Sequence, residues 1–271
     1  MSEEKKTPSI FGTQMARFKI DLSNREISDL SDDRSLGEIR SLVISNNQFR
    51  SFDFVDKTPY LIELDASKNH LSEGIAKIGQ MLYLSKLYLS SNLFERITGF
   101  PLINSLTVLD LSNNHLTSAS ELPSLPNLVQ LKLSHNNIAE LQIDSLTSLQ
   151  VLDISFNVIK YLSLPKLPSL RQLDANNNAI KEIQEFQEDD LPCMWSLDLR
   201  SNSIETSNTL SALSKLPMLF DLKINSNPIV DPENLYIQDA IVVLPNISKL
   251  DGEIVTAKMK VKAQLKESKD E

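Results

Sequence analysis

Leu106 to Leu116 reads L-T-V-L-D-L-S-N-N-H-L, and related stretches recur from Lys19 to Pro228. Apolar residues occupy the first, fourth, sixth and eleventh positions of most copies, and a polar residue occupies the ninth. In steps of 21 to 25 residues, the ninth positions are Arg25, Asn47, Asn69, Asn92, Asn114, Asn136, Asn157, Asn178, Asn202 and Asn227. A fixed period of this kind indicates stacked repeats that share one continuous core.

Each copy carries the pattern of a short strand. Its fourth and sixth positions, such as Leu109 and Leu111, are apolar and alternate with residues that face the other side. Ten such strands, stacked in parallel about 4.8 Å apart, predict a sheet about 43 Å long. A sheet of this length fits a helix or a protein surface better than a metabolite.

The asparagine at the ninth position has a structural explanation. The chain must turn after each strand, and the turn leaves peptide groups inside the stack that need partners. An amide side chain both donates and accepts, so it satisfies the turn of its own repeat and of a neighbour. We therefore predict a structural ladder, which consists of Asn47, Asn69, Asn92, Asn114, Asn136, Asn157, Asn178, Asn202 and Asn227.

The pattern L-x-x-L-x-L-x-x-N-x-L resembles the leucine-rich repeat, which implies an α/β solenoid, a curved horseshoe of about ten repeats with a parallel concave sheet. The second half of each repeat is short and carries prolines, namely Pro101, Pro123, Pro126, Pro165, Pro168, Pro192 and Pro217. Proline disfavours helix interiors, so the convex side should be mostly 3₁₀ or extended. This resembles the Sds22-like subclass. Thr209 to Leu216, in a longer repeat, is expected to hold a helical turn or two.

The chain divides into four expected parts. Residues 1–16 form an N-terminal cap or tail, in which Ile10, Phe11 and Met15 cover the first repeat. Residues 17–230 are the repeats, and residues 231–253 are a C-terminal cap. Residues 254–271 are a charged helical tail with Ile254, Val261 and Leu265 at helical spacing. This tail either binds a partner or packs partly on the cap.

The cap begins at Asp231–Pro232–Glu233, a helix-start signal, and its helix should run to about Val243. Its buried side is expected to hold Tyr236, Ala240, Ile241 and Leu244, with Ile247 and Leu250 closing the core. The run from Asn227–Pro228 to Asp251–Gly252 resembles the cap of Sds22, of the spliceosomal U2 A′ protein and of many ciliary leucine-rich repeat proteins.

Composition limits the classes of function. The formal net charge is −9, which disfavours general binding to nucleic acid or anionic membranes. Cys193 is the single cysteine, the first residues carry no apolar signal segment, and no apolar stretch has the length of a membrane span. We therefore expect a cytoplasmic protein with no membrane partner.

The sequence offers no arrangement for catalysis. The three histidines are His70, His115 and His135, and none is predicted to pair with Cys193 or a serine as a nucleophile and its base. Phosphate-binding glycine loops and metal-ligand motifs are missing from the sequence. We expect no enzyme activity, no cofactor, no metal and no small-molecule substrate.

The expected binding surface is the concave face, formed by the second, third, fifth, seventh and eighth positions. Six aspartates at the fifth position form an acidic ladder, interpreted mainly as scaffold rather than as a metal or basic-peptide site. Aromatics at solvent-facing positions are favoured contact points unless variable turns or the tail cover them. The predicted site consists of Tyr88, Asp110, Asp153, Phe156, Asp174, Trp195, Asp198, Arg200 and Phe220. Trp195 and Phe220, at equivalent positions of adjacent repeats, should stack.

Three functional classes follow from resemblance. Phe18 to Leu30, with Arg25–Glu26 at the motif, and Ser196 to Ile204 resemble the radial-spoke leucine-rich repeat family. That family implies a non-catalytic structural component of a ciliary or flagellar axoneme, bound to other spoke proteins. The alternative is an Sds22-like regulator that binds a protein phosphatase catalytic subunit on its concave face. A nuclear scaffold similar to U2 A′ fits less well, because ten repeats are too many.

Overall fold

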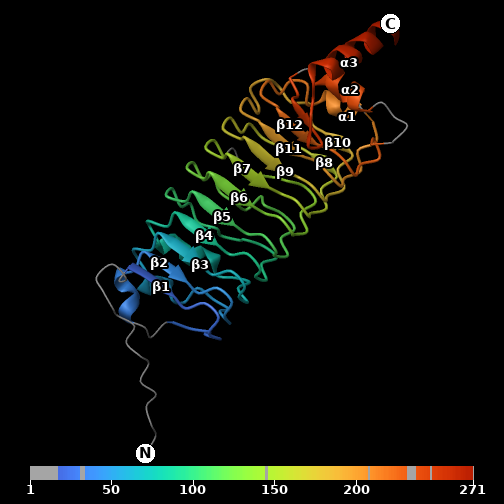
Figure 1. Ribbon diagram of the computed structural model, residues 1–271. Coiled ribbons are helices and arrows are strands. Elements are labelled where there is room, and N and C mark those ends of the chain that lie inside the picture. Colours follow the sequence, from blue (N-terminus) through green and yellow to red (C-terminus); the bar gives the residue numbers. More distant parts are fainter. Residues whose placement is uncertain are drawn as a thin grey trace, which may run out of the picture.

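The computed structural model describes residues 18–30, 34–143, 146–206, 208–230, 236–244 and 246–270. The predicted N-terminal cap residues Ile10, Phe11 and Met15 lie outside these residues, as does the helix start at Asp231–Pro232–Glu233. The described chain winds into a single stack of turns, with one strand from each turn lying side by side along the stack (Figure 1).

Ten short strands recur with the period of the motif and pair in parallel, in sequence order. They are β1 (Lys19–Asp21), β2 (Ser41–Val43), β3 (Glu63–Asp65), β4 (Lys86–Tyr88), β5 (Val108–Asp110), β6 (Gln130–Lys132), β7 (Val151–Asp153), β9 (Gln172–Asp174), β11 (Ser196–Asp198) and β12 (Asp221–Lys223). The fourth positions align across the sheet, as in Leu87↔Leu109 and Leu109↔Leu131. The predicted parallel solenoid is therefore confirmed.

Burial explains why these strands form. In turns two to ten the fourth and sixth positions, such as Leu131 and Leu133, are buried in one continuous core, and Ile20 and Leu22 of the first turn are partly buried against it. The third and fifth positions, such as Gln130 and Lys132, lie on the other side of the sheet and are half-buried. Since each turn contributes so few core residues, its stability depends on both neighbouring turns.

The convex side is mostly 3₁₀ and extended, as the prolines predict. It carries η2 (Arg34–Glu38), η3 (Val55–Lys57), η4 (Ile75–Gln80), the paired strands β8 (Tyr161–Leu162) and β10 (Glu182–Ile183), and α1 (Asn208–Ser211). The single turn of α1 overlaps the stretch predicted to hold a helical turn or two. Adjacent turns pack so closely here that a Cβ added at Gly79 would lie 2.9 Å from Pro101 Cβ.

The asparagine ladder forms as predicted. Asn136 Oδ1 accepts from the amide of Leu116 in the preceding turn, at 2.9 Å. Its Nδ2 donates to the carbonyls of Leu111 at 3.0 Å and Leu133 at 2.9 Å, one in each turn. The same bonds recur down the column, and all ladder members are buried except the half-buried Asn178. Each amide thus joins two turns through polar groups that would otherwise lack partners.

The cap closes the sheet with two further strands and a helix. Strand β13 (Lys249–Leu250) pairs in parallel with β12, and β14 (Glu253–Ile254) returns antiparallel. Helix α2 (Tyr236–Val243) buries Ala240 and Ile241, and Leu244, Ile247 and Leu250 are buried beyond it, in agreement with the predicted cap core.

Asp251 accepts hydrogen bonds from the two residues that follow β12 and from the first residue of α2. Its Oδ1 accepts from the amides of Ile224, at 2.6 Å, and Asn225, at 2.8 Å. The Tyr236 hydroxyl donates to Oδ2 at 3.0 Å. Burial, the charge of Asp251 and this hydrogen bond raise the pKa of Tyr236 to about 12. One side chain therefore satisfies two backbone amides beyond β12 and holds α2 against the end of the stack.

Helix α3 (Ala257–Asp270) packs on α2 and extends past the end of the stack (Figure 1). Val255 and Ala263 are buried and Met259 packs against the core, whereas Ile254, Val261 and Leu265 are exposed. The stripe identified from helical spacing therefore faces solvent, and Met259 and Ala263 form the packed side of the helix instead. In the described residues, no helix combines the length and apolarity needed to cross a membrane.

Candidate protein-binding surface

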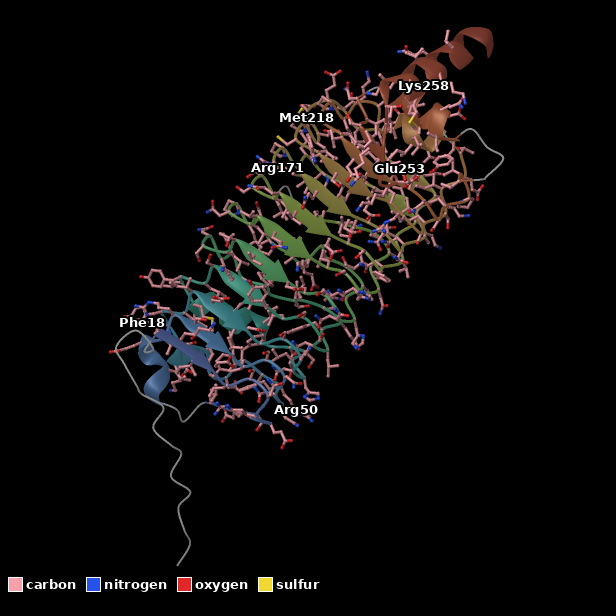
Figure 2. The ribbon with its side chains drawn as sticks, in the orientation of Figure 1. Phe18, Arg50, Arg171, Met218, Glu253 and Lys258 are labelled. Atoms are coloured by element: carbon pink, nitrogen blue, oxygen red, sulfur yellow. The ribbon has the colours of Figure 1, made fainter. Side chains whose placement is uncertain are left out.

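The predicted site residues lie at or beside the strands of turns four to ten. Figure 2 shows the side chains along these turns and labels Arg171 and Met218 at one edge of the stack. Tyr88, Asp110, Asp153, Asp174 and Asp198 are the last residues of β4, β5, β7, β9 and β11. Trp195 and Phe220 directly precede β11 and β12, and Arg200 and Phe156 follow β11 and β7. The structure brings together the residues of turns eight to ten, whereas Tyr88 lies five strands from β11.

The aspartate ladder caps the ends of its own strands. Asp153 Oδ1 accepts from the Ser155 amide at 3.1 Å and from Ser155 Oγ at 2.7 Å. The same contact to the residue two positions later is made by Asp21, Asp65, Asp110, Asp174 and Asp198. These contacts support the scaffold interpretation of the ladder. Among the described residues, no three His, Cys, Asp or Glu side chains gather closely enough to hold a metal ion.

The carboxylates of turns eight and nine differ in charge environment. Burial raises the pKa of Asp174, and the negative charges of Asp198 and Asp153 raise it further. Burial also acts to raise the pKa of Asp198, but hydrogen bonds from Arg200 and the charges of Arg200 and Lys223 lower it overall. Asp198 lies 2.6 Å from the Arg200 guanidinium and 3.5 Å from Lys223 Nζ. Asp198 is therefore already neutralised, and Asp174 is the acid of this pair without a salt-bridge partner among the described residues.

Trp195 and Phe220 stack, as the sequence predicts. Their ring centroids are 4.3 Å apart and the rings are inclined by 6°. The Phe220 amide donates to the Trp195 carbonyl at 3.0 Å, so adjacent turns hold the rings in register. Trp195 is nevertheless 44% exposed. This is a flat, ordered aromatic surface of the kind that anchors protein interfaces.

A second stack, of His135 on Phe156, joins turns six and seven, with centroids 4.1 Å apart. Both residues occupy the eighth position, which is left-handed in all ten turns, with φ from 51° to 59°. Asparagine tolerates this conformation and occupies it at Asn24, Asn46, Asn113 and Asn177, whereas phenylalanine is unfavourable there. Phe156 was predicted as a site residue and His135 was not, although both occupy the eighth position of adjacent turns and that equivalence was the available signal.

An aromatic row at the N-terminal end was missed. Arg40 lies over the rings of Phe18 and Tyr60, at 5.9 Å and 5.0 Å from their centroids, and Tyr60 lies 6.2 Å from Tyr83. The three rings are exposed. Tyr60 and Tyr83 each precede the first motif position by one residue. That place lies outside the positions expected to form the binding surface. Aromatics at that position were the available signal.

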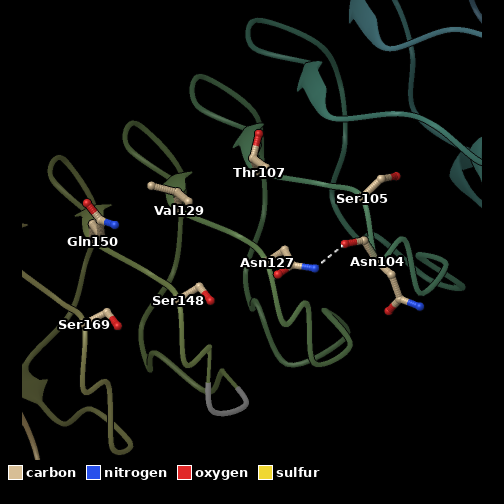
Figure 3. Close-up of a pocket in the computed structure, with 8 residues that line it drawn as sticks. All are labelled: Asn104, Ser105, Thr107, Asn127, Val129, Ser148, Gln150 and Ser169. Carbon is tan, nitrogen blue, oxygen red and sulfur yellow. Dashed lines mark hydrogen bonds between the residues drawn. The ribbon is translucent and has the colours of Figure 1, made fainter.

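The same position forms a polar row in the central turns. Asn127 Nδ2 donates to the Asn104 carbonyl at 2.9 Å (Figure 3), and Ser148 Oγ donates to the Pro126 carbonyl at 2.6 Å. With Ser105, Thr107, Val129, Gln150 and Ser169, these side chains line a shallow groove along the edge where strands begin. The side chains that line it are small and mostly polar, and none is acidic.

Comparison with known families identifies the repeat. Residues 149–270 match the family described as leucine-rich repeat, and residues 104–146 match two copies of leucine-rich repeats. The chain is a leucine-rich repeat protein. Neither matching family is an enzyme family.

Relatives of this leucine-rich repeat protein match only in part. An uncharacterised leucine-rich repeat-containing protein of Schizosaccharomyces pombe is 40% identical over 86 residues, which is 30% of this chain and 13% of the relative. The homolog of a protein phosphatase 1 regulatory inhibitor subunit in Arabidopsis thaliana is 32% identical over 106 residues, 37% of this chain and 32% of the relative. The matches therefore span less than a third of each relative's length.

Solved structures share the fold. An internalin of Listeria monocytogenes aligns with a TM-score of 0.66 at 22% identity, over 83% of this chain and 64% of the internalin. The leucine-rich repeat domain of APL1B also aligns with a TM-score of 0.66 at 22% identity, over 78% of this chain and 65% of that domain. At these identities the similarity establishes the solenoid fold.

Proposed function

We propose that this protein is a non-catalytic scaffold that binds a partner protein through the concave side of its C-terminal turns. The observation that carries the proposal is the exposed Trp195–Phe220 stack, held in register by two adjacent strands. Large aromatic side chains lose little conformational freedom on binding when they are already ordered, and they dominate interface energetics. The adjacent carboxylate of Asp174, with no salt bridge among the described residues, favours a partner with a basic side chain.

The partner we favour is a protein phosphatase catalytic subunit. Support comes from the partial similarity to the Arabidopsis thaliana homolog of a protein phosphatase 1 regulatory inhibitor subunit. The Sds22-like repeat class inferred from the prolines is compatible with it. Phe156 and Tyr88 extend the aromatic surface along the same side of the sheet, toward the N-terminal turns.

Replacing Trp195 and Phe220 together by alanine should weaken binding of a protein phosphatase 1 catalytic subunit by about 30-fold or more, because the stacked pair, as an interface anchor, should contribute at least about 2 kcal/mol. Isothermal titration calorimetry of the purified chain measures this. The melting temperature should change little, since both rings lie on the solvent side of the sheet. Tyr161→Ala, which removes an exposed aromatic from the convex strand β8, is the matched control.

Unchanged affinity in the double variant would contradict the concave site. If the unmodified chain does not bind the catalytic subunit, the phosphatase assignment is wrong. A large loss of thermal stability would show that the two rings belong to the core instead.

The axonemal location stays a prediction from the resemblance of Phe18 to Leu30 and Ser196 to Ile204 to the radial-spoke family. A tagged copy expressed in a flagellated cell should then localise along the axoneme, together with radial-spoke proteins. Fluorescence microscopy checks this, and a diffuse signal outside the flagellum would contradict it. Both assignments use the same solenoid as a protein-binding scaffold.

A further inference from the structure

The edge at which the strands begin carries an unusual row of side chains. We define the strand-entry strip as the residue before the first motif position and the residue after it, in turns three to ten. Its members are Tyr60, Ile62, Tyr83, Ser85, Ser105, Thr107, Asn127, Val129, Ser148, Gln150, Ser169, Arg171, Cys193, Trp195, Met218 and Phe220. None of them is buried.

The strip is depleted of charge. Charged residues make up 23% of the chain, so a strip of this size would carry about four, yet Arg171 is its single charged member. The strip holds no acid over turns three to ten, and the charged Glu38 and Arg40 at the same positions of turn two mark its N-terminal limit. Depletion of acids and lysines, together with exposed tyrosine, tryptophan, methionine and arginine, is the composition of a protein interface. On a chain with net charge −9, an acid-free strip is where two copies approach with the least repulsion.

The order of side chains along the strip is symmetric. Turns three and four present exposed Tyr60, Ile62 and Tyr83, and turns nine and ten present exposed Trp195 and Met218. Turns five to eight between them are mostly small or polar and line the groove in Figure 3. Counted from either end of the strip, two turns with exposed apolar side chains are followed by two turns with mostly small or polar ones. The midpoint lies between turns six and seven.

The polar centre is ordered in advance. Ser105 Oγ donates to the Leu84 carbonyl at 2.8 Å, and Ser169 Oγ donates to the Thr147 carbonyl at 2.7 Å. The side chains of Asn127 and Ser148 are held in the same way. Such groups still offer hydroxyl and amide oxygens as acceptors to a facing surface, and little side-chain freedom remains to be lost on association.

We infer that the strand-entry strip is the contact surface of an antiparallel homodimer, with its two-fold axis between turns six and seven. A two-fold axis pairs each surface with itself in reverse, so turn three faces turn ten of the second copy and turn four faces turn nine. The symmetric order of the strip is what such pairing requires, because apolar ends meet apolar ends. Binding to an unrelated partner imposes no symmetry of this kind.

The size of the strip sets the strength of the dimer. Seven intervals of about 4.8 Å give a length of about 34 Å, and two rows of side chains cover about 500 Å² per copy. This is below the roughly 800 Å² per partner of a standard stable interface. The dimer is therefore expected to be weak and reversible, and its equilibrium should be sought at protein concentrations of about 10 to 100 μM.

Sedimentation equilibrium of the chain alone should show a monomer–dimer equilibrium in this concentration range. Tyr83→Glu places a charge against the apolar end of the second copy and should raise the dissociation constant at least about tenfold. Circular dichroism confirms that this variant, changed at an exposed position, stays folded. A chain that is monomeric at every concentration, or a dimer that tolerates Tyr83→Glu, would overturn the inference.

Disulfide trapping tests the register. Cys193 is the single cysteine, and antiparallel pairing places it opposite turn four of the second copy. Tyr83→Cys should therefore form a covalent dimer on mild oxidation, since the two-fold axis sets each row of the strip against the same row and a disulfide needs Cα atoms within about 7 Å. Ser91→Cys, in the same turn but beyond the other end of β4, should not. Equal cross-linking by Ser91→Cys, or by the unmodified chain through Cys193 alone, contradicts the register. Trp195 and Phe220 belong both to this strip and to the proposed phosphatase site, so the dimer and the phosphatase complex exclude one another. Cross-linking is measured without phosphatase, and phosphatase binding is measured at chain concentrations too low for dimerisation, so each proposal can fail without the other.

Discussion

Replacing Asn136 by alanine is expected to lower the free energy of unfolding by about 4 kcal/mol. The amide bonds the backbone of two turns, through Leu116, Leu111 and Leu133, and all of these groups are buried. Alanine leaves the buried Leu116 amide without a partner, which costs about 1 to 3 kcal/mol. It also removes one of the two donors from each of the Leu111 and Leu133 carbonyls, which keep bonds from Asn114 and Asn157, at a cost of about 1 kcal/mol each. Asn136 lies in the sixth of ten stacked turns, so the loss weakens contacts on both sides of it.

Urea denaturation followed by far-ultraviolet circular dichroism measures this loss. Asn137→Ala is the matched control, because the neighbouring asparagine is exposed and should change the free energy of unfolding by less than about 0.5 kcal/mol. Equal effects of the two substitutions would show that the ladder amides are not the main support of the turns.

Asp251→Ala should have the second largest effect, a loss of about 3 kcal/mol concentrated at the C-terminal end. Alanine removes the acceptor of the Ile224 and Asn225 amides and of the Tyr236 hydroxyl. It also places an alanine at φ 51°, where asparagine and aspartate are tolerated better. The last strands and α2 should separate before the central turns do, since each turn depends on its neighbours.

Hydrogen exchange monitored by mass spectrometry locates this effect. Peptides from β12, β13 and α2 should exchange faster, while peptides from β5 and β6 keep their protection. Asp251→Asn retains Oδ1 as an acceptor and tolerates the left-handed conformation, so most of the protection should return. Uniformly faster exchange along the chain would contradict a local cap.

Most of the solenoid was predictable because its determinants are local and repeated. The period, the apolar fourth and sixth positions and the asparagine column predicted parallel strands in register, and ten strands follow that register. The stacking of Trp195 on Phe220 was predictable for the same reason, since equivalent positions of adjacent turns must be neighbours. Prolines were sufficient to exclude regular helices from most of the convex side.

Contacts outside the motif were not predictable in the same way. Tyr60 and Tyr83 occupy equivalent positions of adjacent turns, so their contact could have been predicted. The placement of Arg40 over Tyr60 could not, because it joins different positions of two turns. Helical spacing identified an apolar stripe on the tail, but it gave no means of choosing between Val261 and Met259 as the packed side. In the structure Met259 packs against the core and Val261 faces solvent.

The sequence by itself determined the repeat, the strand register and the asparagine ladder. Each turn buries the same positions, such as Leu111 and Leu133, and must satisfy the same peptide groups, as Asn136 does. The tertiary structure alone decided which non-equivalent positions of different turns meet at the surface, such as Arg40 with Tyr60. It also decided that the aspartates cap strand ends rather than project from the sheet. The physical reason is that burial repeats with the period of the sequence, whereas surface contacts depend on how successive turns are superposed.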